Sequence, residues 1–546
     1  MFTVGSTPRL GLLALVHSRN SQVLCTTHTV VAFAAQSFSS PRPRSVPFRI
    51  ERGALVVWGP MTDLKTTAGK IEDLDAKLAE SRAPLGEGEP AARARVTQLL
   101  DEGSFVETDA LARHRSTDFG REHDRPYTDG VVTGYGSIDG RRVCVFSQDG
   151  EIFDGTMGEV YAEKLTKVYD LAIKTGVPII GIYESTGPRV QEGIVTMAGY
   201  ARLMARVSQA SGLIPQISVI AGNTSGIAAF APTFADVLIV AQGTALHQAA
   251  SHVAGAEPET FGGAAAHAES GTAHLVASDG KQALSLVRDV LAYFPANNRA
   301  EAPRVEAGSV ADFDLNAVIP DTAAQAYDMG DVIKAVVDEG SFFELSAEAA
   351  QNILTGFAYI DGRAVGIVAN QPLALAGALD SAAAEKAARF VRTCDAFNTP
   401  IVEFVDSPGF VPTPEEEKAG LLRRASKFAY AQAEASVGKL TVITRKAIGP
   451  AYVFMGAKDL GADLVYAWPT AEIAVTQASQ ASLAIYGSED KEEEMDELFL
   501  HPYAAAERGL ADNVIEPKAT RHYLVEGLRL LERKAVAQVP KKHGTV

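Results

Sequence analysis

The sequence predicts an α/β protein made of two similarly folded domains in tandem, and two observations lead to this prediction. Short β-branched runs such as VCVFSQ, VPIIGIY and ISVIAG alternate with Ala-rich amphipathic segments such as GEVYAEKLTKVYDLAIKTG, which is typical of parallel β-α units. The same order of segments then occurs a second time. With 546 residues and 47% hydrophobic content, the chain is long enough to form a core in each copy.

Two pairs of segments define the repeat. Residues 133–149 read TGYGSIDGRRVCVFSQD and residues 355–371 read TGFAYIDGRAVGIVANQ, a separation of 222 positions. Residues 173–190 and 394–411 both contain a helix end, a proline, an apolar strand and a Ser/Pro/Gly turn, in that order. Internal self-similarity of this kind indicates duplicated structural units.

A third matching pair contains a turn of small residues. ISVIAGNTSGIAAF, which ends at Phe230, corresponds to LTVITRKAIGPAYVF in the second copy, so Gly226 lies opposite Gly449. In both copies an apolar run leads into a glycine and then into residues suited to opening a helix. A strand–turn–helix of this kind directs free N–H groups and the positive end of a helix dipole at one point.

Composition suggests the domain limits. The segment 300–330 is rich in Pro, Ala and Asp without a clear period, so we expect domains at 61–315 and 316–546. Residues 1–60 contain six arginines and a single acid, and they are expected to be disordered. They resemble either a targeting leader or the product of a mis-called start, because ordinary helical sequence begins at Met61.

Charge and cysteine usage restrict the class of protein. A net charge of −17 argues against nucleic acid or an anionic membrane as the main partner, and no apolar run approaches the roughly 20 residues of a membrane span. The three cysteines lie far apart without metal-ligand spacing, which indicates a reducing compartment. We therefore expect a soluble cytoplasmic protein without a metal site.

Common catalytic motifs do not occur in the sequence. It contains no G-x-G-x-x-G after a strand and no P-loop, which argues against dinucleotide binding and ATP hydrolysis. It also lacks H-E-x-x-H and the G-x-S-x-G elbow of serine hydrolases. The distinctive features are the two small-residue turns that offer backbone N–H groups.

From about Lys65 to its C-terminus the sequence resembles the carboxyltransferase (β) subunit of bacterial biotin-dependent acyl-CoA carboxylases of the propionyl-CoA and acetyl-CoA type. The segments that carry the resemblance are DEGSFVETDALARHRSTDFG, DGVVTGYGSIDGRRVCVFSQD, GEVYAEKLTKVYDLAIKTGVPIIG, SGLIPQISVI, EKAARFVRTCDAFNTPIV, GLLRRASKFAYA and HPYAAAERGLADNVI. The resemblance implies two tandem crotonase-like (ClpP/crotonase) domains in a ring-shaped hexamer. It places acyl-CoA on the N-terminal domain of one protomer and carboxybiotin on the C-terminal domain of a neighbour.

The resemblance also implies the reaction and its partners. Carboxybiotin loses CO2, the biotin anion takes the α-proton of the acyl-CoA, and the enolate captures CO2, while backbone N–H groups stabilise two enolate-like oxygens, one in each half. Biotin is expected on a separate carrier, because this chain lacks the A-M-K-M attachment motif. The implied partners are a biotin carboxylase/biotin carrier α subunit and other β subunits, in a homo- or hetero-hexamer.

The implied catalytic residues lie in the two turns. Gly226 and Ile227 would hold the thioester oxygen, and Gly449, Pro450 and Ala451 form the turn for the biotin ureido oxygen. The family pattern has two adjacent glycines in each turn, and both second glycines are replaced here. A branched Ile crowds a close backbone approach, and a proline has no N–H to donate.

The implied substrate-binding residues follow from two further segments. Ser185, Gly187 and Arg189 lie in the loop after a strand and are expected to contact acyl-CoA, although Arg189 would serve equally in a structural salt bridge. The remaining residues match a G-G-A-x-x-H segment beside the CoA site: Gly262, Gly263, Ala264 and His267. For His267, capping or filling its own loop is the alternative role.

The altered turns leave three functional hypotheses. The first is an active carboxyltransferase, with walls reshaped for an unusual acyl-CoA. The second is a non-catalytic β-type paralogue that scaffolds a mixed acyl-CoA carboxylase complex. The third is a related decarboxylase or another crotonase-type enzyme that uses the CoA site alone.

Overall fold

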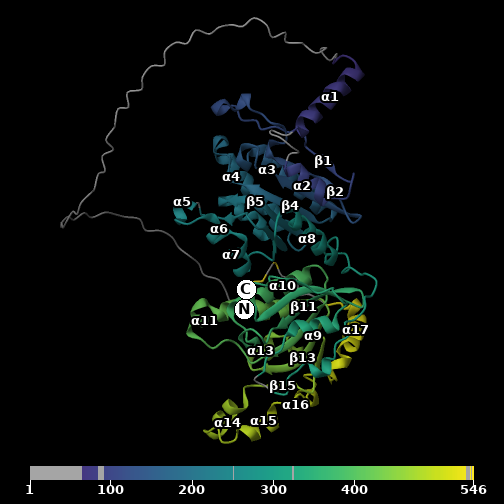
Figure 1. Cartoon of the computed structure of the whole chain (residues 1–546), viewed down its shortest axis with the longest axis vertical. Helices are drawn as coiled ribbons and strands as arrows, with labels where there is room; N and C mark the ends of the chain where they lie inside the picture. The colour runs from purple at the N-terminus through teal and green to yellow at the C-terminus, as the bar shows by residue number, and fades with distance from the viewer. Residues whose placement is uncertain are drawn as a thin grey trace, which may run out of the picture. The chain divides into compact units, whose positions relative to one another are not determined.

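The computed structural model describes residues 64–83, 91–249, 251–322, 325–536, 542, 544 and 545 (Figure 1). All of them belong to the compact unit that extends from Thr62 to Val546. The predicted leader, residues 1–60, lies outside the described residues. Within the described residues, no helix combines the length and apolar character that crossing a membrane requires.

The first half of the chain forms one mixed sheet of eight strands. Its order is β1-β2-β3-β4-β5-β6-β8, with β7 paired to the end of β5, and only the β1–β2 and β2–β3 pairs are antiparallel. The strands are β1 (Val106–Thr108), β2 (Val131–Ile138), β3 (Arg141–Gln148), β4 (Ile179–Ser185), β5 (Gln216–Ser225), β6 (Val237–Ala241), β7 (Leu246–His247) and β8 (Leu275–Ala277).

The second half repeats this sheet strand for strand, in the order β16-β14-β13-β12-β11-β10-β9 with β15 paired to β13. The strands are β9 (Phe343–Leu345), β10 (Ile353–Ile360), β11 (Arg363–Asn370), β12 (Ile401–Ser407), β13 (Lys439–Ile448), β14 (Leu464–Ala467), β15 (Glu472–Ala474) and β16 (Asn513–Val514). Strands β2, β3 and β4 recur after 222 positions and β5 after 223. The predicted tandem α/β fold is therefore confirmed, including the one-residue change of register.

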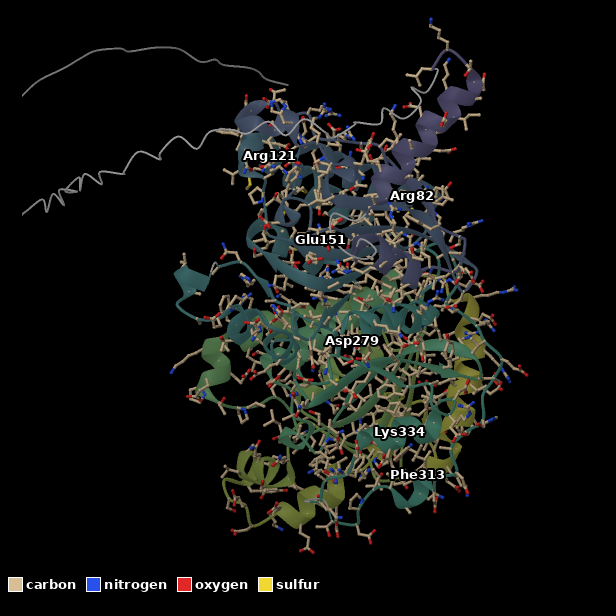
Figure 2. The ribbon with its side chains drawn as sticks, turned by 45° about the horizontal axis from the view of Figure 1, so that its top comes forward. Arg82, Arg121, Glu151, Asp279, Phe313 and Lys334 are labelled. Atoms are coloured by element: carbon tan, nitrogen blue, oxygen red, sulfur yellow. The ribbon has the colours of Figure 1, made fainter. Side chains whose placement is uncertain are left out.

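Helices cover the sheets where local capping signals predict them. Asp279, labelled in Figure 2, accepts a hydrogen bond from Gln282 N at 2.7 Å and begins α8, and Asp380 caps α10 in the same way through Ala383 N. Gly176, with φ +64°, ends α3. The α-helices are α1 (Thr67–Arg82), α2 (Ala91–Leu99), α3 (Glu159–Thr175), α4 (Ile194–Ala210), α5 (Ser251–Ala254), α6 (Pro258–Gly262), α7 (Ala264–Glu269), α8 (Gly280–Tyr293), α9 (Met329–Val336), α10 (Ser381–Ala396), α11 (Pro414–Ala419), α12 (Leu421–Glu434), α13 (Pro450–Phe454), α14 (Ala478–Tyr486), α15 (Glu492–Phe499), α16 (Tyr503–Glu507) and α17 (Thr520–Leu530).

The first sheet is buried on both faces, as parallel sheets usually are. Along β4, Ile179 and Tyr183 join the core formed with α3 and α4, whereas Ile180 and Ile182 join the core formed with α2 and α8. The alternation follows from the two-residue period of a strand. It explains why β4 is apolar throughout rather than amphipathic.

The core beneath α8 continues into the second half of the chain. The Tyr293 ring stacks on that of Tyr359 with centroids 4.9 Å apart, and its hydroxyl donates to Ser341 O at 2.7 Å. Phe294 meets Phe357 and Phe397 edge-on at 5.2 and 5.3 Å. The two halves thus share one continuous apolar cluster.

The chain after α8 already pairs with the second half. Val305 N donates to Gly362 O at 2.8 Å, and Ala364 N donates to Pro303 O at 3.0 Å. These bonds lie ahead of the predicted domain limit between residues 315 and 316. That limit stays a prediction, since the contacts describe packing rather than independent folding.

A turn with three consecutive left-handed residues occurs at the same place in each half. Gly155 ends the first turn and Gly377 ends the second, with φ values of +67° and +76°. A Cβ atom on Gly155 would lie 2.6 Å from Glu184 O, and one on Gly377 would lie 2.2 Å from Asp406 O. The other left-handed residues of these turns are not glycines, so it is the close approach to the end of a strand that requires glycine at these two positions.

We predict that Gly377→Ala lowers the free energy of unfolding by about 2 to 4 kcal/mol, because left-handed strain adds to overlap with Asp406 O. Gly340→Ala is the matched control, since Gly340 has φ +72° but no atom within 4 Å of its Cβ position. The control should lose only about 1 kcal/mol in urea unfolding. Equal losses in the two variants would contradict the role of the close approach.

Candidate active site

The first predicted turn lies where β5 ends. Ser185 of β4 pairs with Thr224 of β5, so the loop after β4 begins beside this turn. Gly226 has φ +62°, and nothing lies within 4 Å of its Cβ position, so one side of the turn is open. Ile227 packs against the core of the first half. The branched side chain is thus accommodated by the core, and the backbone of Gly226 stays accessible.

The second predicted turn follows β13 and has a different donor set. Gly449 has φ +58° and ψ −134°, and its N–H donates to Ala474 O of β15 at 2.9 Å. Pro450 is the first residue of α13 and contributes no N–H. Ala451 is fully buried, and its N–H belongs to the first helical turn, where no intrahelical carbonyl is available. Neither Gly449 nor Pro450 therefore offers a free N–H at this turn.

Ser185 and Gly187 shape the loop that follows β4. The Ser185 hydroxyl donates to Gly155 O at 2.7 Å and accepts from Gly187 N at 3.3 Å. Gly187, with φ +110°, also accepts from Met157 N at 2.8 Å. These bonds hold the loop against the left-handed turn that ends at Gly155. Ser185 thus has a structural role that the sequence reasoning did not include.

Arg189 lies in a buried network of charges. Its side chain is 1% exposed, and Nη1 lies 2.6 Å from Asp129 Oδ1 and 2.8 Å from Glu192 Oε1. Nη2 donates to Thr156 O at 2.9 Å and to Asp129 O at 3.2 Å. Of the two roles that the sequence allowed, these contacts favour the structural salt bridge over acyl-CoA binding.

The G-G-A-x-x-H segment forms the junction of α6 and α7. A Cβ atom on Gly262 would lie 2.7 Å from Leu246 O, and one on Gly263 would lie 2.4 Å from Glu259 O. His267 Nε2 lies 2.6 Å from Leu246 O, so this nitrogen carries the proton and donates it. Ala264 is buried beside them. The segment thus braces β7, and with it the end of β5, which supports the loop-filling role of His267.

The sequence reasoning missed two sets of buried charges. Beneath the Asp129 segment, Lys164 Nζ donates to Thr128 O at 2.9 Å, and burial lowers the pKa of this ammonium to about 8. In the second half, Asp406 at the end of β12 lies 3.0 Å from Arg445 Nε, and burial raises the pKa of this carboxyl. For the second set, the sequence signal was an acid inside the apolar run IVEFVDS, because a buried carboxyl group needs a buried partner.

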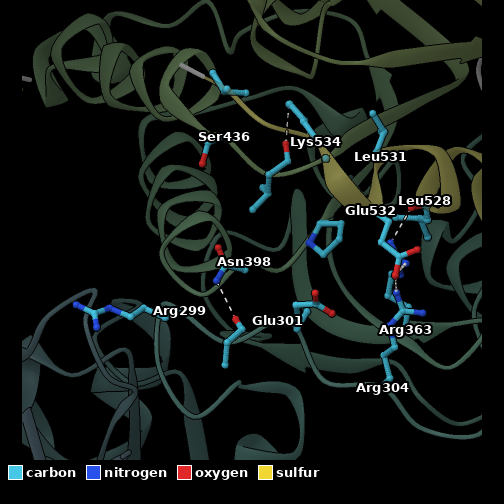
Figure 3. A pocket seen from close by; sticks show the side chains of 16 residues that line it. Arg299, Glu301, Arg304, Arg363, Asn398, Ser436, Leu528, Leu531, Glu532 and Lys534 are labelled. Atoms are coloured by element: carbon cyan, nitrogen blue, oxygen red, sulfur yellow. Dashed lines mark hydrogen bonds and ion pairs between the residues drawn. The ribbon is translucent and has the colours of Figure 1, made fainter. Parts of the chain in front are cut away.

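Two cavities lie away from the predicted site. One of about 470 Å³ is shown in Figure 3; there Arg304 and Arg363 contact Glu532, and Lys534 Nζ donates to Val437 O at 2.8 Å. The other, of about 700 Å³, lies between α10 and the segments that lead into β5, β6 and β8. Neither cavity is lined by a predicted site residue.

Large apolar side chains are exposed close to the turns. In the first half Val190 is 80% and Ile194 is 81% exposed, directly after the Ser185–Arg189 loop. In the second half Val475 is 91% exposed, next to Ala474, whose carbonyl accepts the Gly449 N–H. Exposed apolar residues clustered around a site are typical of a surface that another protein covers.

Duplicated α/β sheets with a glycine turn after the fifth strand of each half define a two-domain crotonase-like protein. The family model described as carboxyl transferase domain matches residues 84–546. The chain therefore belongs to the carboxyl transferase domain family.

Relatives with curated names cover most of the chain. The biotin-dependent acetyl-/propionyl-coenzyme A carboxylase beta5 subunit of Mycobacterium tuberculosis is 48% identical over 527 residues, which is 89% of this chain and 96% of the relative. The methylmalonyl-CoA decarboxylase subunit alpha of Veillonella parvula is 44% identical over 507 residues, 88% of this chain and 100% of the relative. The crystal structure of the transcarboxylase 12S hexamer with hydrolyzed methylmalonyl-coenzyme A bound has a TM-score of 0.85 at 39% identity, covering 88% of this chain and 98% of that chain.

We predict that Arg189→Met lowers the free energy of unfolding by about 3 to 5 kcal/mol, because it leaves Asp129 and Glu192 buried without a cation. Arg529→Met serves as control, since the Arg529 side chain is 58% exposed in its ion pairs with Asp361 and Glu526. Urea unfolding should hardly change in the control. A stable Arg189→Met protein that loses only acyl-CoA affinity would instead assign Arg189 to the substrate.

Proposed function

We propose that this protein is the carboxyltransferase subunit of an acyl-CoA carboxylase, which moves CO2 from carboxybiotin on a carrier to the α carbon of an acyl-CoA. The observation that carries the proposal is the pair of glycine turns at equivalent ends of β5 and β13. The reaction needs two oxygens stabilised by preorganised N–H groups, and the repeat supplies two such places. Similarity to carboxylase β subunits over most of the chain supports this function.

The first turn is assigned to the thioester oxygen of the acyl-CoA. Gly226 and Ile227 donate their backbone N–H groups, and the absence of atoms around the Gly226 Cβ position leaves room for close approach. Ser185 and Gly187 hold the adjoining loop in place. Gly262, Gly263, Ala264 and His267 brace the strand that supports the turn.

The second turn is assigned to the ureido oxygen of biotin. Carboxybiotin supplies the CO2 and, after losing it, the base for the α-proton. Because Gly449 N–H is used by Ala474 and Pro450 has none, the Ala451 N–H is the donor at this turn. The fit to biotin therefore rests on fewer donors than two adjacent glycines would provide.

The assembly follows from the exposed apolar residues beside each turn. Val190 and Ile194 follow the loop beside the first turn, and Val475 lies next to the residue that binds Gly449 in the second, so a neighbouring β subunit can cover both. We propose a hexamer, as in the transcarboxylase 12S structure, with each complete site shared between copies. A biotin carboxylase and carrier α subunit completes the enzyme, which we place in the cytoplasm.

Pro450 favours one alternative function. A proline at the first helical position keeps the fold while removing an amide donor, as expected of a non-catalytic β-type subunit in a mixed hexamer. Losing one oxyanion donor typically lowers the rate by about 10² to 10³. The similarity to a methylmalonyl-CoA decarboxylase subunit supports, less strongly, a decarboxylase that uses the same CoA site.

We predict that the chain starting at Met61 carboxylates acetyl-, propionyl- or long-chain acyl-CoA when it is mixed with a carboxybiotin carrier and biotin carboxylase. Pro450→Gly restores an N–H and should raise kcat by up to about 10² to 10³. Ile227→Gly in the same background tests the first turn. Pro517→Gly is the matched control, because Pro517 also opens a short helix of the second half.

Inactivity of the unmodified chain combined with activity of the double variant would identify a silenced structural subunit. Inactivity of both would overturn the proposed carboxyltransferase. Decarboxylation of methylmalonyl-CoA without carboxylation would select the third hypothesis.

We predict that Ile194→Asp and Val475→Asp each break the assembly into smaller species in light scattering, since a carboxylate at these positions must be desolvated on contact. Leu530→Asp is the control, because Leu530 is 73% exposed on α17, away from both turns. An unchanged mass in both site variants would exclude this surface from the assembly.

A further inference from the structure

A buried carboxyl group and a buried carboxamide meet behind the second turn. Glu403 of β12 is 1% exposed and Gln432 of α12 is 0% exposed. Gln432 Nε2 donates to Glu403 Oε1 at 2.5 Å and to Phe454 O at 3.4 Å. Because Nε2 faces two acceptors, this orientation of the amide is the favourable one, and the flipped amide would place oxygen against oxygen.

The two remaining oxygens of this pair have no partner. Glu403 Oε2 and Gln432 Oε1 are both buried, and neither makes a hydrogen bond within the described residues. A carboxylate only accepts hydrogen bonds, so when Glu403 is ionised it can give no hydrogen bond, and Glu403 Oε2 and Gln432 Oε1 stay without a partner. A proton on Glu403 would give this pair, which otherwise presents two unpartnered acceptors, the hydrogen that it lacks.

We propose that Glu403 is a protonated carboxylic acid paired with the Gln432 carboxamide, and that this neutral pair positions α13 and therefore the Gly449–Ala451 turn. The pair touches α13 at its C-terminal end, through Phe454 O. It also adjoins Gly456, where a Cβ atom would lie 2.8 Å from Glu403 Oε2. Across α13, Met455 N donates to Ala451 O at 2.9 Å and links this end to the turn.

The charges around Glu403 do not ionise it. Lys439 of β13 is the near cation, but its Nζ donates to Gln432 O and its own pKa is lowered by burial. Asp395, Asp463 and Lys534 interact electrostatically with Lys439, and Thr441 Oγ1, which like Glu403 Oε2 lies near the Cβ position of Gly456, donates to Gly456 O at 2.8 Å. No ion pair within 4.0 Å joins Glu403 to a cation of the described chain. Burial raises the pKa of Glu403 to about 7, against opposing effects of the Gln432 hydrogen bond and Lys439.

The pH dependence has a definite sign. Between the ordinary glutamate pKa of 4.5 and about 7, the folded protein binds the Glu403 proton and the unfolded chain does not. The contribution of Glu403 to stability is therefore present at low pH and is lost as pH rises through this window. Near and above pH 7 Glu403 is ionised, the two unpartnered oxygens again lack a donor, and α13 loses its support.

Glu403→Gln tests the protonation directly, because glutamine keeps the shape and the neutral charge at every pH. The difference infrared spectrum of wild type minus Glu403→Gln should contain the C=O band of a carboxylic acid at about pH 6, and this band should fade as pH approaches about 8. Absence of the acid band at about pH 6 would overturn the proposal.

Hydrogen exchange of the peptide that covers α13 tests the positioning. At about pH 8 the wild type should exchange there faster than Glu403→Gln, while the two proteins exchange equally at about pH 6. Asp236→Asn is the matched control, since Asp236 of the first half is a half-buried carboxyl whose pKa is also raised to about 7 by burial. The control should change the pH dependence of stability and leave α13 exchange as in the wild type.

The catalytic consequence rests on the proposed function, but the protonation does not. In an active enzyme, the alkaline decrease in kcat should move to higher pH in Glu403→Gln, with KM for acyl-CoA unchanged. If the acid band is present but wild type and Glu403→Gln have the same α13 exchange and the same pH profile of kcat, the positioning role is overturned. The Glu403–Gln432 pair then contributes only to core packing. If the protein is inactive but shows the acid band and the exchange difference, this inference is supported and only the proposed carboxyltransferase function is contradicted.

Discussion

The close approach of a left-handed turn to the end of a strand is the constraint on which both halves depend. Gly155 and Gly377 lie so near to Glu184 O and Asp406 O that no side chain fits. The approach brings Met157 and Leu379 into hydrogen bonds with the loops after β4 and β12. Those loops begin beside β5 and β13, the strands that end in the functional turns. The close backbone approach at Gly155 and Gly377 thus fixes the loops that lie beside both turns.

The same fold presents different donors in its two halves. In the first half the turn keeps its amides, and the Ile227 side chain is absorbed by the core. In the second half Pro450 opens α13 and Ala474 O accepts the Gly449 N–H, so neither Gly449 nor Pro450 offers a free N–H. The two turns therefore occupy equivalent positions in the duplicated fold but differ in the backbone N–H groups that they offer.

Buried acids meet two kinds of neighbour in this protein. Asp129 and Glu192 share the Arg189 guanidinium, and Asp406 pairs with Arg445. Glu403 has a carboxamide neighbour instead of a cation, and a proton then replaces the missing counter-charge. Burying an ionised carboxylate costs more than protonating it near neutral pH, so the environment decides which solution each acid adopts.

The sequence by itself determined the tandem α/β fold, the opposition of Gly226 to Gly449 and the loss of a donor at Pro450, because strand periodicity, capping residues and proline chemistry are local properties. It could not assign Arg189, since its partner Asp129 lies 60 positions away and only the folded chain brings the two together. The same holds for Ser185, whose hydroxyl bonds to Gly155, and for Glu403, which meets Gln432 across two elements. Burial and long-range pairing decide whether a polar residue binds a ligand or another part of the protein, and these properties arise only in the tertiary structure.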